Sequence, residues 1–174
     1  MRPGGIYNSG EIPGALPGSA SIKLQPGGDT ACPAGTNTQV AIATVGQVAA
    51  SGIDANVAEQ GFYVAEFKGA IWIAFGASVP TALQFTASWT IPGIGTGNDT
   101  HIVEPSWLTS ALANSTVVIP MVFSVSTGAS TFVPGFGTCT VALSCQPTGA
   151  AVTVKRSALA TGTQVLVQIV RRDD

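Results

Sequence analysis

Apolar and polar residues alternate one by one through much of this chain, as they do in strands that bury only one face. The pattern is clearest in residues 81–91, where every second side chain is apolar and most of the others are Thr, Ser or Gln. The apolar positions are Leu83, Phe85, Ala87, Trp89 and Ile91. We therefore predict a half-buried strand here, with Trp89 in the core.

Residues 115–126 repeat the alternation, but a proline interrupts the outward series. The inward positions are Val117, Ile119, Met121, Phe123 and Val125. Pro120 falls on the opposite face, and a proline has no N–H to donate to a neighbouring strand. This strand is therefore predicted to lie at the edge of a sheet or to carry a bulge.

Weaker alternation predicts further strands, which are separated by turns rich in Gly and Pro. These strands cover residues 21–24, 39–48, 61–68, 70–75, 138–145, 151–156 and 163–171. Residues 105–112 are predicted to form one or two helical turns, 53–59 are a weaker helix candidate, and the glycine-rich residues 93–97 are predicted to be a flexible strand connection. Nine short strands in a chain of 174 residues predict an all-β sandwich or barrel.

The domain organisation follows from where this alternation begins. Residues 1–19 show little periodicity and contain several Gly and Pro residues, so we expect an extended N-terminal arm. Residues 20–174 are expected to form a single domain, because their length suits one hydrophobic core. The start of the chain lacks an apolar h-region and no apolar run could span a bilayer, so we expect synthesis in a cytosol.

The cysteines do not suggest a disulfide framework, because Cys32, Cys139 and Cys145 are an odd number. Cys139 and Cys145 are six residues apart, which corresponds to about 20 Å on a straight strand and is too far for a disulfide. They could be joined only if a turn fell between them. We expect instead two small buried side chains on one face of a strand.

Charged residues are scarce: Asp, Glu, Lys and Arg make up 9% of the chain, whereas apolar residues make up 45%. This composition excludes a disordered chain and a coiled coil, and the net charge of −2 does not suggest nucleic-acid binding. Residues 105–154 contain no charged side chain at all. Three explanations stay open, namely a neutral hydrated wall, a face covered by a neighbouring subunit, and a bias of composition.

Titratable groups that could carry catalysis or bind a metal are few. The single histidine, His101, stands near Asp99 and Glu104, and one imidazole with two carboxylates resembles a facial triad in ligand type. No second histidine or thiolate supports a metal site, and the alternative is a loop histidine in a hydrogen bond or an interface. A Gly-X-Ser-X-Gly motif is absent, and residues 93–97 lack the helix and lysine of a phosphate-binding loop. We therefore expect neither an enzyme nor a cofactor.

Candidate contact residues are the large side chains that the alternation places outside the core. Trp72 is out of phase with Ile71 and Ile73, so it is predicted to project from the opposite face. This makes Trp72 the best candidate for a contact, either in an interface or with a ligand. Trp107, in the predicted helical turns, and Pro120 complete the set of candidate interface residues.

Over residues 20–172, the size, the number of strands and the composition resemble a family of virus capsid proteins. These are the small single-jelly-roll major capsid proteins of tailless, membrane-containing icosahedral phages and archaeal viruses, of the sphaerolipovirus type. The resemblance implies an eight- to nine-stranded antiparallel jelly roll that assembles into a shell in the virion, after synthesis in the host cytoplasm. It implies as partners further copies of the chain, other capsid proteins and an internal membrane or membrane-associated virion protein, without a cofactor or a specific nucleic acid.

A second resemblance is to the trimeric C1q/TNF-like jelly rolls. Residues 61–64 (GFYV), 83–88 (LQFTAS) and 162–167 (GTQVLV) follow one another as in that family, although Gln164 stands where its late strand has an acidic residue. This resemblance implies a compact trimer that presents loops to a receptor or a glycan, for instance at a fibre tip. A stable trimer at micromolar concentration would favour this alternative, whereas a monomer or dimer in dilute solution would favour the capsid protein.

Overall fold

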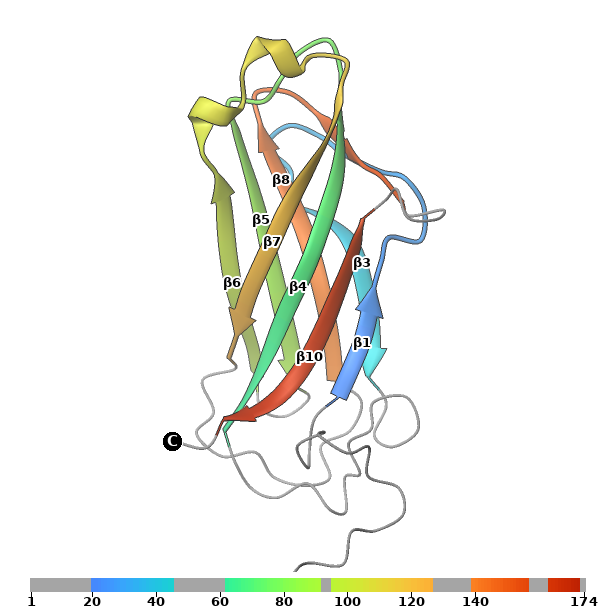
Figure 1. Cartoon of the computed structure of the whole chain (residues 1–174), viewed down its shortest axis with the longest axis vertical. Helices are drawn as coiled ribbons and strands as arrows, with labels where there is room; N and C mark the ends of the chain where they lie inside the picture. The colour runs from blue at the N-terminus through green and yellow to red at the C-terminus, as the bar shows by residue number, and fades with distance from the viewer. Residues whose placement is uncertain (1–19, 46–61, 92–94, 127–138, 157–162, 173–174) are drawn as a thin grey trace, which may run out of the picture.

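Two antiparallel sheets, packed face to face, contain the ten strands of the described part of the chain (Figure 1). The computed structural model describes residues 20–45, 62–91, 95–126, 139–156 and 163–172. The strands are β1 (Ala20–Leu24), β2 (Thr30–Cys32), β3 (Thr38–Val45), β4 (Phe62–Phe75), β5 (Ala82–Ile91), β6 (Gly95–Val103), β7 (Thr116–Val125), β8 (Cys139–Thr148), β9 (Val152–Val154) and β10 (Gln164–Arg172). Two short 3-10 helices, η1 (Pro105–Trp107) and η2 (Ser110–Leu112), lie between β6 and β7.

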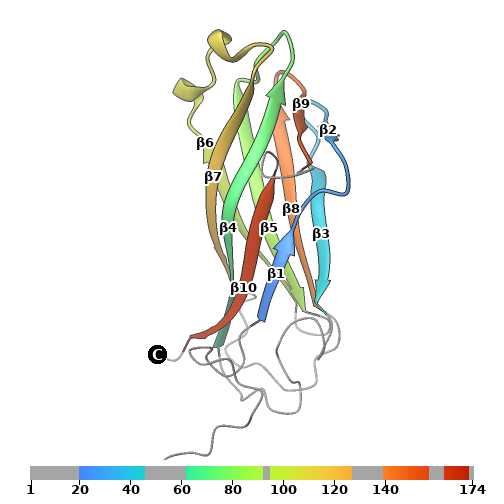
Figure 2. The same cartoon turned by 45° about the vertical axis from the view of Figure 1, so that its right-hand side comes forward.

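The first sheet, sheet A, has the order β1-β10-β4-β9-β2, with β7 on the other side of β4. β10 pairs with residues 62–70 of β4, and β9 pairs with residues 73–75 of the same strand, so β9 and β10 lie end to end. β1 pairs with β10 and β2 pairs with β9 in the same way (Figure 2). Sheet A is therefore four strand positions wide, because two of its positions are filled by interrupted strands.

The second sheet, sheet B, has the order β3-β8-β5-β6. When each interrupted strand counts once, the described chain has eight strand positions that pair in a nested manner. The first position (β1 and β2) pairs with the last (β9 and β10), β3 with β8, β4 with β7, and β5 with β6. This nested pairing across two sheets is that of a jelly roll, so the predicted all-β jelly-roll fold is confirmed.

The core between the sheets is filled by the inward series of the alternating strands. In β5 every second residue is buried, and Phe85 and Trp89 are completely inaccessible to solvent. Phe67 on β4 and Phe123 on β7 meet edge to face, with ring centroids 6.3 Å apart. The strands predicted at residues 81–91 and 115–126, and the core position of Trp89, are thus confirmed.

β4 runs without a break through Gly69, where the sequence pattern predicts a boundary between two strands. A side chain at this position would collide with the neighbouring strand, because a Cβ would lie 2.2 Å from the carbonyl oxygen of Gln164. Gly69 therefore allows the start of β10 to approach β4 closely. The predicted boundary is wrong because this glycine provides space and does not end the strand.

Residues 95–103 form β6, an outer strand of sheet B. The flexible connection predicted at 93–97 is therefore wrong for residues 95–97, residues 93 and 94 lie outside the described residues, and the loop predicted around His101 is wrong. The inward positions of β6 include Gly97, Asp99 and His101, so the alternation that marks the other strands is missing. β2 is also missing from the predicted strands, because three residues are too few to show a period of two.

The remaining expectations have mixed outcomes. η1 and η2 confirm the helical turns predicted in residues 105–112, whereas the candidate at 53–59 and the arm at 1–19 lie outside the described residues. Cys139 and Cys145 lie on one continuous strand, β8, as predicted, and Cys145 is buried and not disulfide-bonded. Within the described ranges, no helix has the length and hydropathy needed to cross a membrane.

Candidate interaction surface

Two exposed apolar side chains, Val118 and Val122, lie on the outward face of sheet A on β7, beside β4, which carries the half-buried Trp72 on the same face. Val118 pairs with Trp72, and Pro120 pairs with Ala70. Directly paired residues share a face of the sheet, with Cβ atoms roughly 5 Å apart. Val122, which is 69% exposed, continues the outward series along β7. We call the side chains of Trp72, Val118, Pro120 and Val122 the β4–β7 patch.

Trp72 projects away from the core, as the sequence predicts, because Ile71 and Ile73 on either side of it are fully buried. Its backbone is held at the junction between β9 and β10. The N–H of Trp72 donates to Oγ1 of the buried Thr163 at 2.9 Å, and its carbonyl accepts the N–H of Lys155 at 2.8 Å. These bonds replace the strand pairing that is interrupted at this point, so Trp72 has a fixed position on the surface.

The free edge of β7 is blocked against further strand pairing. The N–H of Ser124 points away from β4 and donates to Oδ2 of Asp99 on β6 at 2.9 Å. Alternate residues of a strand direct their N–H groups to the same side, so residue 120 would also direct an N–H away from β4 if it were not proline. The edge position that Pro120 predicts is confirmed, since β7 pairs only with β4 among the described strands. Pro120 and Asp99 together disfavour the addition of a strand from another molecule.

Two charged side chains on the outward face of sheet A, Lys68 and Glu66, lie beside the patch. Lys68 pairs in register with Val122, and its ammonium forms an ion pair with Glu66 at 2.7 Å. Around Trp72 the outward positions of β4 and β7 are uncharged, namely Ala70, Ala74, Thr116, Val118 and Pro120. An apolar centre with a polar margin is the usual anatomy of a protein–protein interface.

The outward face of sheet B is different, because its described residues are uncharged and largely polar, and its two exposed isoleucines, Ile42 and Ile102, lie apart on the outer strands β3 and β6. Thr86, for example, lies in a cross-strand row between Ser144 on β8 and Thr100 on β6. The hydroxyls of Thr86 and Thr100 are 3.3 Å apart, and those of Thr90 and Thr96 are 2.8 Å apart. Sheet B therefore presents cross-strand rows of hydroxyl and amide side chains, in which threonine hydroxyls on β5 and β6 hydrogen-bond to one another.

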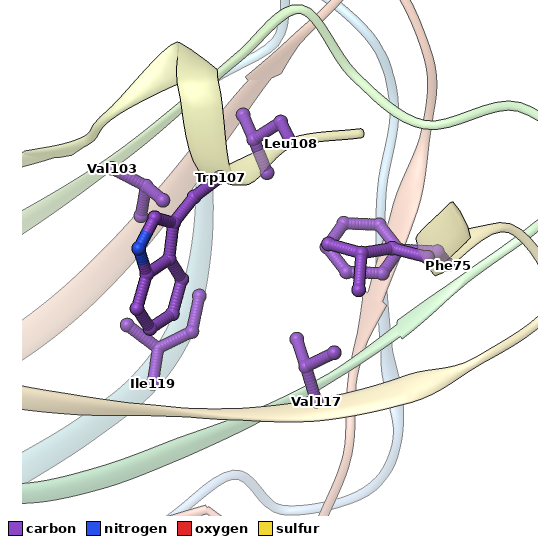
Figure 3. Close-up of a pocket in the computed structure, with 7 residues that line it drawn as sticks. Phe75, Val103, Trp107, Leu108, Val117 and Ile119 are labelled. Atoms are coloured by element: carbon purple, nitrogen blue, oxygen red, sulfur yellow. The ribbon is translucent and has the colours of Figure 1, made fainter. Parts of the chain in front are cut away.

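A second apolar feature, which we call the Trp107 pocket, lies at the end of the sandwich that carries η1 and η2 (Figure 3). Its volume is about 300 Å³ and its lining residues are Phe75, Val103, Trp107, Leu108, Leu112, Val117 and Ile119. The indole of Trp107 lies next to Val103 and Ile119. Trp107 as a whole is 62% exposed to solvent. The lining contains no charged residue, so the pocket suits an apolar group and offers no group for acid–base chemistry.

The structure divides the three candidate interface residues between two surfaces. Val117 and Ile119 line the Trp107 pocket from the inward side of β7, whereas Val118 and Pro120 lie on its outward side. Trp72 and Pro120 are thus neighbours in the β4–β7 patch, and Trp107 belongs to a separate feature. The sequence reasoning missed Val118 and Val122, although the alternation in residues 115–126 places both on the face of Pro120.

The candidate metal ligands have structural contacts on β6. Asp99 accepts the bond from Ser124, and the ring of His101 packs edge to face against Phe123 at a centroid distance of 6.5 Å. Glu104 follows the end of β6 and is exposed. In the part of the chain that the structure describes, no three His, Cys, Asp or Glu side chains gather into a group that could hold a metal ion. Asp99 and His101 here serve the contact between β6 and β7.

An ion pair links the two interrupted strands of sheet A. The ammonium of Lys155 donates to Oδ2 of Asp29, and the backbone N–H of Arg156 donates to its Oδ1 at 2.8 Å. The hydrogen bond from Lys155, followed by that from Arg156, holds the pKa of Asp29 below its usual range. Asp29 therefore ties the segment between β1 and β2 to the segment that follows β9.

No protein-family model and no curated protein matches this sequence. Two solved structures with some likeness to this fold come from infectious bursal disease virus. The structure of the Gx strain has a TM-score of 0.39 and 14% identity, and the match covers 95% of this chain and 44% of that one. The VP2 subviral particle has a TM-score of 0.36 and 13% identity, and the match covers 95% of this chain and 42% of that one. The chain therefore spans less than half the length of these two proteins.

Proposed function

We propose that this chain is a non-enzymatic structural protein that assembles with further copies of itself into the shell of a virus capsid. The jelly-roll pairing of its strands supports a compact building block. The β4–β7 patch and the Trp107 pocket support contacts between such blocks, because both are apolar and accessible at the surface.

The β4–β7 patch is the observation that carries this proposal. Exposed apolar side chains on a monomer are usually scattered, but Val118 and Val122 flank Pro120 on one edge strand, and Val118 stands opposite Trp72. The centres of interfaces are poor in charge and rich in aromatic residues. Because the edge of β7 is blocked, a second copy would contact the outward face of the sheet and would not extend it.

A closed shell requires each subunit to touch neighbours on more than one side. The Trp107 pocket is a second surface for such a contact, in which an apolar side chain of a neighbouring copy would be accommodated. Sheet B, with its hydroxyl and amide array, is then the wall that remains in contact with water. In this arrangement the uncharged face of sheet A is covered by a neighbouring subunit, and the uncharged face of sheet B is a neutral hydrated wall.

The finer identity that we propose is a single-jelly-roll capsid protein of the sphaerolipovirus type, located in the virion after synthesis in the host cytoplasm. Residues 1–19 would tie neighbouring subunits together. Other capsid proteins and an internal membrane or membrane-associated virion protein would be further partners, without a cofactor or a specific nucleic acid. The size, strand number and composition of residues 20–172 support this identity.

A matched pair of charge insertions tests the proposal. In Val122→Glu the new carboxylate stands opposite Lys68, so the fold is preserved by a favourable cross-strand pair while the patch gains a charge. In Thr100→Glu the same charge is placed on the outward face of sheet B. Light scattering and electron microscopy of the full chain should show particles at high concentration for the wild type and for Thr100→Glu, and none for Val122→Glu.

The dilute wild-type protein should be a monomer or dimer. A trimer that is stable at micromolar concentration and in high salt would overturn the proposal in favour of a C1q/TNF-like head. Loss of particles in Thr100→Glu alone would move the contact to sheet B and refute the role of the β4–β7 patch.

A further inference from the structure

Two thiols face each other across the sandwich, although the odd number of cysteines does not predict a disulfide. Cys32 lies on β2 of sheet A and Cys145 lies on β8 of sheet B. Both side chains are completely inaccessible to solvent and are free thiols. β2 contacts β8 here, and the N–H of Gly35, three residues after Cys32, donates to the carbonyl of Pro147, two residues after Cys145, at 2.7 Å. Both cysteines belong to the same buried core cluster, so the two sheets meet at this point beside two thiols.

The surroundings make the two thiols unequal. The Cys32 thiol donates to the carbonyl of Thr30 at a sulfur–oxygen distance of 3.7 Å. Hydrogen bonding from Cys145, followed by that from the N–H of Val154, holds the pKa of Cys32 below its usual range. The bond with Cys32 and burial raise the pKa of Cys145. Cys32 also lies on the short edge strand β2, whereas Cys145 lies on β8 in the interior of sheet B, so Cys32 is the thiol that an oxidant reaches first.

We propose that Cys32 and Cys145 form a disulfide that joins sheet A to sheet B when the protein meets a low-molecular-weight disulfide such as oxidised glutathione. The Cys32 thiolate attacks one sulfur of the oxidant, whose S–S bond breaks and releases one glutathione thiolate. Cys145 then loses its proton and attacks the Cys32 sulfur, which forms the new bond and releases the second glutathione. The protein gives up two protons and two electrons, and one oxidised glutathione becomes two reduced molecules.

Access to the buried Cys32 is provided by the strand on which it lies. β2 has only three residues, pairs only with β9 among the described strands, and is flanked by exposed residues on both sides. Such a short edge segment opens locally at a far lower cost than the core strands. When β2 closes again, it brings the Cys32 sulfur back to Cys145, and the new bond prevents the next opening.

The third cysteine provides the control. Cys139 is on the same strand as Cys145 but six residues away, so it is out of reach of it. The full chain carrying Cys139→Ser should be incubated under native conditions with oxidised glutathione and then assayed for thiols in denaturant. We expect two thiols to fall to none, the mass to decrease by two hydrogen atoms, and a non-reducing digest to join the tryptic peptides 24–68 and 69–155.

A stability measurement separates the cross-link from simple thiol loss. The oxidised Cys139→Ser protein should have a higher urea midpoint than the reduced protein, and dithiothreitol should reverse the increase. Cys32→Ala in the same background should show no such increase after oxidation. Persistence of two thiols, a stable glutathione adduct, or a cross-link between two chains would each overturn the proposal. If Cys32→Ala fails to fold, the peptide map of the Cys139→Ser protein, which retains Cys32 and Cys145, still decides the question.

Discussion

The backbone N–H of Ser124 on β7 donates to the carboxylate of Asp99 on β6 at 2.9 Å. β7 lies at the edge of sheet A and β6 at the edge of sheet B, so this bond closes one side of the sandwich. The side chain of Asp99 thus joins the two sheets and also satisfies a backbone N–H on the exposed edge of β7. Several outcomes of mutation follow from this and from comparable contacts.

Asp99→Ala removes the acceptor of the Ser124 N–H. We expect the free energy of unfolding to fall by about 1 kcal/mol, the usual value for one hydrogen bond, and the protein to aggregate more readily through the edge of β7. Urea unfolding and light scattering at elevated temperature measure the two effects. Asn98→Ala, on the outward side of β6, should leave both unchanged, and an equal effect of the two variants would refute the role of Asp99.

Gly69→Ala places a methyl group against the carbonyl of Gln164, where a Cβ would be only 2.2 Å away. The strands must separate to accommodate it, which should cost about 1–3 kcal/mol of folding stability. Thermal unfolding followed by circular dichroism provides the measurement. Gly76→Ala is the matched control, because a Cβ at residue 76 meets no atom within 4 Å. Unchanged stability of Gly69→Ala would show that β10 does not press on β4 at this point.

Because folding lowers the pKa of Asp29, the free energy of unfolding is expected to decrease in acid. A carboxyl whose pKa is lowered by folding stabilises the folded state fully above its unfolded pKa of about 3.9, and this contribution disappears as the pH falls through its folded pKa. Urea midpoints measured from neutral pH to pH 2 should therefore decline less steeply below pH 4 in Asp29→Asn. Lys155→Met should reduce the slope too, since it removes the first cause of the shift. An unaltered slope in both variants would contradict the ion pair.

Phe85→Asp should abolish folding. The side chain of Phe85 is completely buried between the sheets, and a carboxylate there costs several kcal/mol because no partner compensates for its lost hydration. Gln84→Asp, at the next position but on the outward face of β5, should fold normally. One-dimensional proton NMR distinguishes the dispersed spectrum of a folded chain from that of an unfolded one, and a dispersed spectrum for Phe85→Asp would refute the position of the core.

Deletion of residues 1–19 should leave the jelly roll intact and impair assembly. The thermal midpoint of the shortened chain should match that of the full chain, while particle formation is reduced. An unfolded product would show instead that the arm contributes a strand to the core.

The sequence pattern predicts best the strands whose inward positions are all apolar. β5 and β7 have a complete inward series of apolar residues, so their burial could be read from the alternation. β6 could not be recognised, because it lies at the edge of sheet B next to β7 and its inward positions carry Asp99 and His101. Gly69 was ambiguous for a different reason, since a glycine that ends a strand and a glycine that gives space to a neighbour look the same in a sequence.

The candidate interaction surface was predictable residue by residue but not as a surface. The outward direction of Trp72 and the edge position of Pro120 follow from local alternation and from the chemistry of proline. Their proximity depends on the register between β4 and β7, in which Val118 stands opposite Trp72. Nothing in the local sequence specifies that register, so the β4–β7 patch required the structure.

The nested pairing of the strands also determines when the molecule can complete its fold. β5 and β6 are neighbours in the chain and can associate early, whereas β1 has no partner until β10 has been synthesised. The fold must therefore close from its middle outward, and its last contacts join segments from opposite ends of the described chain. Contacts between such distant segments are slow to form. During synthesis β1 must therefore wait for β10 before the pairing of sheet A can be completed.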